Sequence, residues 1–386
     1  MPPDNRSLMS IIKQSKTLLK RFKSITRATQ TNLQGAKTRT KYVIIESDDW
    51  GAIRTPGKAT LTKMAAKGVN LQKSVYKYDA LASVADLDAL FNVLQQYTDS
   101  KGRCAKITAN TIVANPDFNR IRANDFSAYY YEPFTTTLKN YPEHSKSFSK
   151  WIQAIDHGLF KPQFHGREHL NINRWLQKLK SGEDLARFCF DLGMTYSGVG
   201  DYSFMEAYDW DTKADITLQN KVISEGINLF EELFGYRPAS FIAPCYNWDP
   251  ELEENLAKSG IKTIQGIKSQ LVPTGIFNEY SPLKHYFGEM NNQGLHYTIR
   301  NCFLEPSLNP QKDWVDSCLA QVKSAFNWHK PAIICSHRIN YIGYIEPKNR
   351  DRGLKDLALL LSTIIKKWPD VEFITTDELI TKMAWE

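Results

Sequence analysis

Two adjacent carboxylates, Asp48 and Asp49, are the residues whose place in the chain points most directly to chemistry. They follow an apolar run, residues 42–45, that is typical of a buried parallel strand, and a core strand would not tolerate them. We therefore expect the strand to end there, at the edge where α/β proteins carry their functional loops. Neighbouring side chains of an extended strand point to opposite faces, so both carboxylates can serve one site only if the backbone bends, as Gly51 would permit. A turn in which one Asp caps the next helix is the alternative.

The motif His165-Gly-Arg-Glu-His169 is a second group of possible ligands. Two histidines four residues apart can point the same way from a helical turn, and imidazole is a common ligand of zinc. A structural or surface role is the commoner explanation of such a pair taken alone. However, the pair follows a short apolar run, as do the polar residues of segments 241–248 and 332–338, so all four strand ends would lie on one rim of a barrel.

The order of these motifs resembles that of the polysaccharide deacetylases, carbohydrate esterase family four, over residues 41–375. Ser47-Asp48-Asp49 corresponds to the family's Asp-Asp strand end, and the histidine pair corresponds to its His-x-x-x-His motif. Phe241-Ile-Ala-Pro244 corresponds to Phe-Arg-x-Pro-Tyr, and Cys335-Ser-His337 corresponds to a late strand that ends in Leu-x-His. The resemblance implies a (β/α)7-type parallel barrel that removes N- or O-acetyl groups from a polysaccharide or its precursor.

The resemblance also implies a role for each motif residue. A divalent metal would be held by Asp49, His165 and His169, and zinc is the expected ion because carboxylate and imidazole suit a borderline cation. Asp48 would be the general base, and His337 would be the general acid that protonates the departing group.

The segment that follows Pro244 is expected to bind the substrate. Backbone N–H groups at Cys245 or Tyr246 would hold the oxyanion, as the resemblance implies. Aromatic side chains beside the motifs could pack on sugar rings, or they could pack within the rim; they are Trp50, Tyr246 and Trp248.

The third motif lacks the family's arginine, which orients the base, because Ile242 occupies its position. Arg338, next to the expected acid, or Arg300 could supply this charge from another strand. Arg338 is therefore included among the expected catalytic residues. The acidic fourth motif could be Glu305 or Asp313.

Two other functions are compatible with the sequence. A glycoside hydrolase on a related barrel would need two carboxylates on either side of a glycosidic bond and no metal, and Glu46 and Glu168 are available for it. A non-catalytic carbohydrate-binding descendant is favoured by the missing arginine. Metal content would separate the first alternative from a deacetylase, and turnover of an acetylated sugar would separate the second.

From residue 41 onward, short apolar runs alternate with amphipathic stretches, which predicts one α/β domain over residues 41–386. Ser83 with Asp86 indicates a helix start, Gly235 indicates the end of a helix over 218–234, and Asp249-Pro250 indicates another start. Seven or so βα units in series favour a parallel barrel. The further strands expected are 105–114, 261–264, 331–335 and 371–375, and the later helices are 313–326 and 353–367.

Residues 1–40 are expected to form a basic, amphipathic arm. Residues 1–41 contain ten Lys or Arg but a single acid, Asp4, and apolar side chains such as Leu8, Ile12 and Leu19 fall on one helical face. Such a helix could pack on the protein or lie on an anionic membrane, whereas nucleic-acid binding is not expected because no recognition module follows. No apolar run approaches the roughly 18 residues that a membrane span needs. The six scattered cysteines predict reduced thiols and a cytoplasmic location.

Overall fold

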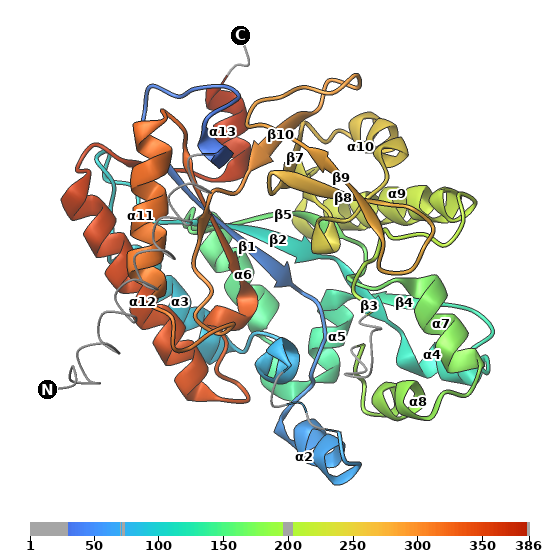
Figure 1. The fold of residues 1–386 in the computed structure, drawn as a ribbon. Coiled ribbons are helices and arrows are strands. Elements are labelled where there is room, and N and C mark those ends of the chain that lie inside the picture. The colour runs from blue at the N-terminus through green and yellow to red at the C-terminus, as the bar shows by residue number, and fades with distance from the viewer. Residues whose placement is uncertain (1–29, 70, 72–73, 196–203, 384–386) are drawn as a thin grey trace, which may run out of the picture.

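A parallel sheet curled into a barrel forms the centre of the molecule (Figure 1). The computed structural model describes residues 30–69, 71, 74–195 and 204–383. Each strand pairs in parallel with the next one around the barrel, from β1 through β2, β5 and β6 to β7. Their bounds are β1 Tyr42–Trp50, β2 Ile107–Ile112, β5 Phe160–Gly166, β6 Ser240–Ile242 and β7 Thr263–Gly266.

One interrupted strand closes the ring. Its first part, β10 (His296–Ile299), pairs with β7, whereas its continuation, β11 (Cys302–Phe303), pairs with β12 (Ala332–His337). The backbone N–H of Arg300 still bonds Gly266 O on the β7 side, and that of Asn301 bonds Ile333 O on the β12 side. Because β12 pairs in turn with β1, the ring has seven strand positions. The expected (β/α)7-type parallel barrel in a single domain is confirmed.

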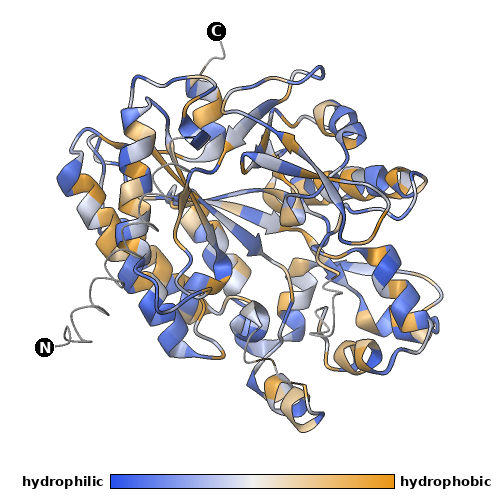
Figure 2. Ribbon diagram, viewed as in Figure 1, coloured by the Kyte–Doolittle hydropathy of each residue, from blue (hydrophilic) through white to orange (hydrophobic). Residues whose placement is uncertain are grey.

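Helices surround this barrel (Figure 1). Their buried residues, such as Leu87, Val322 and Leu357, join the outward side chains of the strands in the largest apolar cluster, and Ile223 and Phe230 belong to a second one. In Figure 2 these helices mix apolar and polar residues, as helices with one buried face do. The main helices are α2 Lys58–Ala66, α3 Val84–Gln95, α6 Ser147–Asp156, α7 Ile172–Lys180, α8 Asp184–Asp191, α9 Asp215–Phe234, α10 Glu253–Lys258, α11 Trp314–Asn327, α12 Pro347–Lys367 and α13 Thr376–Lys382.

The predicted helix signals are confirmed. Ser83 and Asp86 form a capping box at the start of α3, and Gly235 ends α9 with a left-handed φ of 76°. Asp249 caps a short 3-10 turn that leads into α10, and the Asp313 side chain caps α11 by accepting from the Asp316 N–H. These caps fix where the helices begin, and therefore how the loops above the barrel are anchored.

Several boundaries differ from the expectation. Helix α12 begins at Pro347, because Glu346 caps it and proline suits the first helical position. The expected loop and short helices over 115–149 include a small antiparallel pair, β3 (Ala114–Pro116) with β4 (Tyr131–Pro133), and helices α4 (Phe118–Ala123) and α5 (Phe134–Asn140). The hairpin of β8 (Ser269–Pro273) and β9 (Tyr280–Lys284) was not expected. The strand expected at 371–375 is the short β13 (Glu372–Phe373), which pairs with the beginning of β1.

The described part of the expected arm, residues 30–40, is attached to the barrel domain. Asn301 Nδ2 donates to Asn32 Oδ1 at 2.9 Å, and Lys330 Nζ donates to the Gly35 carbonyl at 2.6 Å. Residues 1–29 lie outside the described residues, so their membrane contact stays a prediction. Among the helices that the structure describes, none has the length and apolar character of a membrane span.

Candidate metal centre and catalytic pair

The end of β1 bends where the two carboxylates lie. Asp49 has a φ of 72°, and the pairing of β1 with β2 shifts register between Ser47 and Trp50. Gly51 follows with a φ of 85°, and a Cβ there would lie 2.3 Å from Ile112 O, so this position requires glycine. The predicted departure from an extended backbone is confirmed. Because of this bend, the side chains of Asp48 and Asp49 lie in the same region of the molecule, although each contacts different partners.

Asp49, His165 and His169 are brought together as a possible metal-ligand set, with ligand atoms within 4.8 Å of one another. Asp49 Oδ1 lies 3.5 Å from His165 Nε2 and 3.4 Å from His169 Nε2. A tetrahedral metal with bonds of about 2.0–2.2 Å would separate its ligand atoms by roughly 3.4 Å. The Asp49-histidine distances therefore fit a zinc-sized ion. His165 belongs to β5 and His169 follows in a bend, so the expected helical turn is not what joins them.

The protonation of the two imidazoles also fits a metal. His165 Nδ1 lies 2.9 Å from Ile242 O, and since a carbonyl can only accept, Nδ1 carries the hydrogen. In the neutral form of this ring, the lone pair lies on Nε2, a buried atom that makes no hydrogen bond within the described part of the chain. Burial and the Arg54 cation lower the pKa of His169 well below its usual value, so this ring is neutral. A neutral imidazole is the form that binds a metal.

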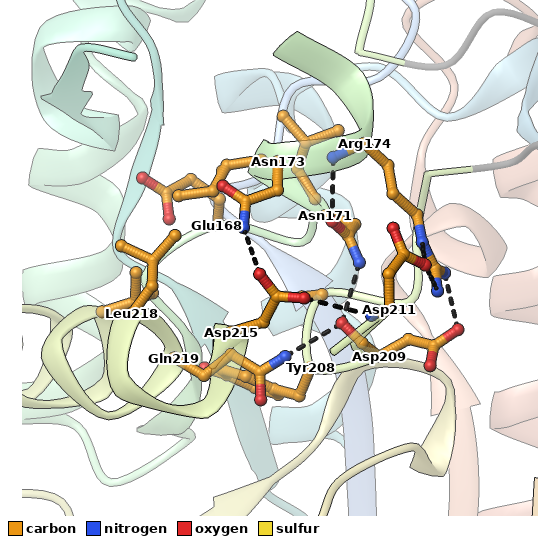
Figure 3. Close-up of a pocket in the computed structure, with 14 residues that line it drawn as sticks. Glu168, Asn171, Asn173, Arg174, Tyr208, Asp209, Asp211, Asp215, Leu218 and Gln219 are labelled. Carbon is orange, nitrogen blue, oxygen red and sulfur yellow. Dashed lines mark hydrogen bonds and ion pairs between the residues drawn. The ribbon is translucent and has the colours of Figure 1, made fainter. Parts of the chain in front are cut away.

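A pocket with a polar lining, to which Glu168 and Asn171 belong, lies next to the bend that contains His169 in the chain (Figure 3). Asn171 caps α7 by accepting from the Arg174 N–H, and its Nδ2 donates to the Asp209 carbonyl at 3.0 Å. Arg174 Nη1 donates to the Asp209 carboxylate at 2.6 Å. Glu168 lines the same pocket. The pocket thus lies beside the ligand set, and its residues hold the backbone that positions His169.

Asp48 is paired with Arg300 from the interruption between β10 and β11. Arg300 Nη1 and Nη2 each donate to one Asp48 oxygen at 2.6 Å, and Asn110 Nδ2 donates to Oδ1 at 2.8 Å. Below it, Arg300 Nε donates to Glu46 at 2.6 Å. Burial would raise the pKa of Asp48, but Arg300 outweighs burial and lowers that pKa to about 2. Arg300 therefore supplies the charge that is missing at Ile242.

Arg338 has a different partner from the one expected. Its guanidinium donates to Asp79 Oδ1 at 2.7 Å and to the Ala52 carbonyl at 2.7 Å, and its side chain is completely buried. Among the hydrogen bonds of the described residues, none joins Arg338 to Asp48. Arg338 follows His337 in the chain, but strand β12 ends at His337. The Arg338 side chain therefore points away from Asp48, into the interior of the domain. Arg338 thus contacts the site through Asp79.

His337 is held by Glu305. His337 Nδ1 donates to Glu305 Oε1 at 2.6 Å, and Asn340 Nδ2 donates to Glu305 Oε2 at 2.7 Å. His337 Nε2 points toward Asp48 Oδ2 at 3.9 Å, and 37% of its side chain is exposed. Of the two candidates for the acidic motif, Glu305 has this contact, whereas Asp313 caps a helix. Sequence reasoning could not choose between them, because both precede the last strands of the barrel.

The segment after Pro244 turns sharply. Cys245 and Tyr246 both have left-handed φ values, 57° and 56°. The Tyr246 N–H donates to the Ala243 carbonyl, so the Cys245 N–H is the better candidate for an oxyanion donor. The Tyr246 hydroxyl lies 3.1 Å from Arg300 Nη1, and this side chain therefore contacts the Asp48 network.

Trp50 and Trp248 do not have the positions expected of sugar platforms. Trp50 is 1% exposed and packs edge-on against Trp151 and Phe160 in the core. Trp248 is 2% exposed, and its Nε1 donates to Glu253 at 3.0 Å. Neither indole offers a free face to a sugar ring, so the expectation was wrong for both residues. The alternative was packing within the rim, and the structure instead buries both indoles, Trp50 in the core.

No protein-family model matches this chain, and no curated protein matches it either. Proteins described as a putative polysaccharide deacetylase and a peptidoglycan deacetylase are among its structural neighbours. A peptidoglycan deacetylase from Bacillus subtilis covers 90% of this chain with 94% of its own, at 11% identity and a TM-score of 0.35 or below in its two structures. A family 4 carbohydrate esterase from Streptomyces lividans covers 84% with 88% of its own, at 11% identity and a TM-score of 0.35. The match to a 4-alpha-glucanotransferase from Thermococcus litoralis covers 90% of this chain and 41% of the glucanotransferase chain, at 10% identity and a TM-score of 0.44. Because these TM-scores are all below 0.5, no conclusion about function is drawn from these similarities, and the functional proposal rests on the geometry of the site.

The pairing of His337 with Glu305 predicts a pH effect. Burial opposes the imidazolium, but the Glu305 and Asp48 carboxylates outweigh burial and raise the pKa of His337 to about 10. His337 would therefore keep its acidic proton through neutral pH and lose it as the pH rises through that value. Glu305→Gln should lower this pKa and move the alkaline fall of kcat/KM to lower pH. The measurement is the pH profile of both proteins under the same metal conditions, because a bound cation would lower the pKa in each.

Asp313→Asn is the matched control for Glu305→Gln. It replaces the other candidate for the acidic motif, which caps α11 and makes no hydrogen bond to His337 among the described residues. The control should leave the pH profile in place. An unchanged alkaline limb in Glu305→Gln would show that Glu305 does not set the proton affinity of His337.

Proposed function

We propose that this protein is a metal-dependent hydrolase that removes acetyl groups from a polysaccharide or oligosaccharide. The observation that carries the proposal is the buried Asp49, His165 and His169 set beside a separate carboxylate and imidazole, Asp48 and His337. One carboxylate and two neutral imidazoles would leave a divalent ion with net positive charge and open positions. Zinc is the ion that this donor set suits best.

The residues around the set would divide the chemistry. When bound, the metal would act as a Lewis acid and lower the pKa of a coordinated water. Asp48 is ionised, and Arg300 and Asn110 fix both of its oxygens, so it would take a proton at a defined position. A carboxylate with so low a pKa is too weak a base to deprotonate bulk water. It could accept a proton from a water that a bound metal has made more acidic. His337 would donate its proton to the departing sugar nitrogen or oxygen.

The oxyanion and the substrate would be bound by the turn after Pro244. We propose the Cys245 N–H as the oxyanion donor. The neighbouring Tyr246 N–H is already bonded to the Ala243 carbonyl within the turn, whereas the Cys245 N–H does not make that bond. Tyr246 contacts Arg300 and lies within reach of the same network. Cys245 and Tyr246 therefore remain proposed substrate-contacting residues, while Trp50 and Trp248 do not.

A glycoside hydrolase is disfavoured by the surroundings of the two carboxylates that it would need. Glu46 is fully buried beneath Arg300, and Thr376 Oγ1 donates to its other oxygen at 2.8 Å. Glu168 is also buried, and Arg167 Nε donates to both of its oxygens. Neither carboxylate is placed to flank a glycosidic bond with a free oxygen.

The non-catalytic alternative loses its main support. The missing arginine of the third motif favoured it, but Arg300 makes a two-pronged contact with Asp48 from another strand. The free thiols of the described cysteines are compatible with the reducing, cytoplasmic location that we propose.

The proposed function is tested by metal analysis and acetate release. Protein purified without chelator should contain about one divalent ion per chain, and it should release acetate from N-acetylglucosamine oligomers or from O-acetylated xylo-oligosaccharides. A chelator should stop the release, and added Zn²⁺ should restore it. Reducing sugar released without acetate, and with no metal dependence, would favour the glycoside hydrolase instead.

A further inference from the structure

A buried arginine contacts the expected metal ligand Asp49. Arg54 Nη2 donates to Asp49 Oδ1 at 2.8 Å, which is the same oxygen that faces the two histidine Nε2 atoms. The Arg54 side chain is 1% exposed. Another nitrogen of the Arg54 guanidinium, Nη1, contacts the Met205 sulfur, which is only a weak acceptor and carries no charge. Asp49 is therefore the partner that neutralises this end of the guanidinium.

The contact is part of a cluster of four buried charges. Arg54 Nε donates to Asp79 Oδ2 at 3.2 Å, and Arg338 donates to Asp79 Oδ1 at 2.7 Å. Two guanidinium groups and two carboxylates thus alternate from Asp49 to Arg338, and each of the four side chains is 6% exposed or less. The cluster is neutral without a metal. A divalent cation at Asp49 would add two positive charges next to Arg54 in a region from which water is largely excluded.

We propose that Arg54 is the counter-ion of Asp49 in the metal-free protein and that it weakens metal binding at the proposed site. This inference rests on the proposed function only for the identity of the ligand set. Arg54 positions Asp49 toward the two histidines, and it also withdraws electron density from the oxygen that would bind the ion. Because like charges repel strongly at low dielectric, the site would bind its metal less tightly than the same three ligands without the arginine.

The charge argument predicts opposite effects for two substitutions. Arg54→Gln removes the positive charge and leaves Asp79 paired with Arg338, so the cluster gains a net negative charge. It should tighten Zn²⁺ binding by roughly tenfold or more, as the loss of a close like charge in a buried site implies. It should also lower the melting temperature of the metal-free protein, because Asp49 would be buried without its partner. Asp79→Asn leaves the cluster with a net positive charge and should weaken Zn²⁺ binding.

The experiment is a Zn²⁺ titration of each full-length protein against a competing chelator, together with melting curves with and without the metal. Arg54→Lys keeps the charge and should bind Zn²⁺ much as the parent does. Arg103→Gln is the matched control, because Arg103 is a partly buried arginine that pairs with Asp99 and Glu372 instead of Asp49. It should lower stability without changing the metal affinity. If Arg54→Gln does not fold, Asp79→Asn still tests the sign of the effect.

The outcomes separate this inference from the proposed function. Unchanged or weaker Zn²⁺ binding in Arg54→Gln, or tighter binding in Asp79→Asn, would overturn the inference even if the parent released acetate. Tight Zn²⁺ binding that appears only in Arg54→Gln would support the inference, while a metal-free and inactive parent would contradict the proposed function.

Discussion

Replacing His165 by alanine is expected to empty the metal site. The histidine contributes Nε2 at 3.5 Å from Asp49 Oδ1, and its other nitrogen is anchored on Ile242 O, so the neighbouring strand fixes the orientation of the ring. Loss of one ligand out of three leaves a pair that binds a borderline cation weakly. Metal content should fall from about one ion per chain to near zero, and acetate release should be lost with it.

The control for this variant is a second buried imidazole. His144 is 1% exposed and its ring packs edge-on against Tyr344 at 4.5 Å between centroids, outside the ligand set. His144→Ala should lower the unfolding temperature through lost packing but keep the metal and the activity. Full metal occupancy in His165→Ala, measured on folded protein, would remove His165 from the ligand set.

The sequence predicted the site where local pattern and chain order determine it. The apolar run of β1 stops at residues that a core cannot accept, and the histidine pair follows another strand, so the shared rim could be inferred. The bend at Asp49 could be expected because two neighbouring carboxylates cannot otherwise face one site, and Gly51 follows two residues later. The helix caps at Ser83 and Asp249 are local hydrogen-bonding signals, and they appear in the structure where expected.

The side-chain direction of Trp50 could not be read from the sequence. A strand alternates its faces with a period of two, but the irregular register after Ser47 changes which face each later residue occupies. Trp50 consequently points into the core, where it meets Trp151 of α6. Proximity to a motif in the chain was therefore a poor guide to the position of this indole.

The partner of Asp48, Arg300, could not be predicted from local sequence patterns either. Arg300 lies between β10 and β11, which have four and two residues, and neither is long enough to show a strand signal. Their pairing with β7 and β12 comes from closure of the ring, a long-range effect. The sequence could name Arg300 and Arg338 as candidates, but only the topology places the first inside the barrel and ties the second to Asp79.

Asp48 and Asp49 are expected to fail in different ways when each is replaced by asparagine. Asp49→Asn should lower metal affinity and activity together, because it weakens a ligand. Asp48→Asn should keep the metal and lose turnover by about 10²–10⁴-fold, the usual contribution of a positioned general base. The amide would still accept one hydrogen bond from Arg300, whose Nε remains paired with Glu46, so the buried charge keeps a partner. Both variants are measured for folding, metal content and acetate release.

If Asp48 and Asp49 belong only to a structural turn without a catalytic role, the two variants should behave differently. Each substitution would then lower the unfolding free energy moderately and leave turnover unchanged in the folded fraction. If Asp48→Asn releases acetate as fast as the parent, Asp48 is not the base. Glu46 could not easily replace it, since this carboxylate is fully buried and bonded to Arg300 and Thr376.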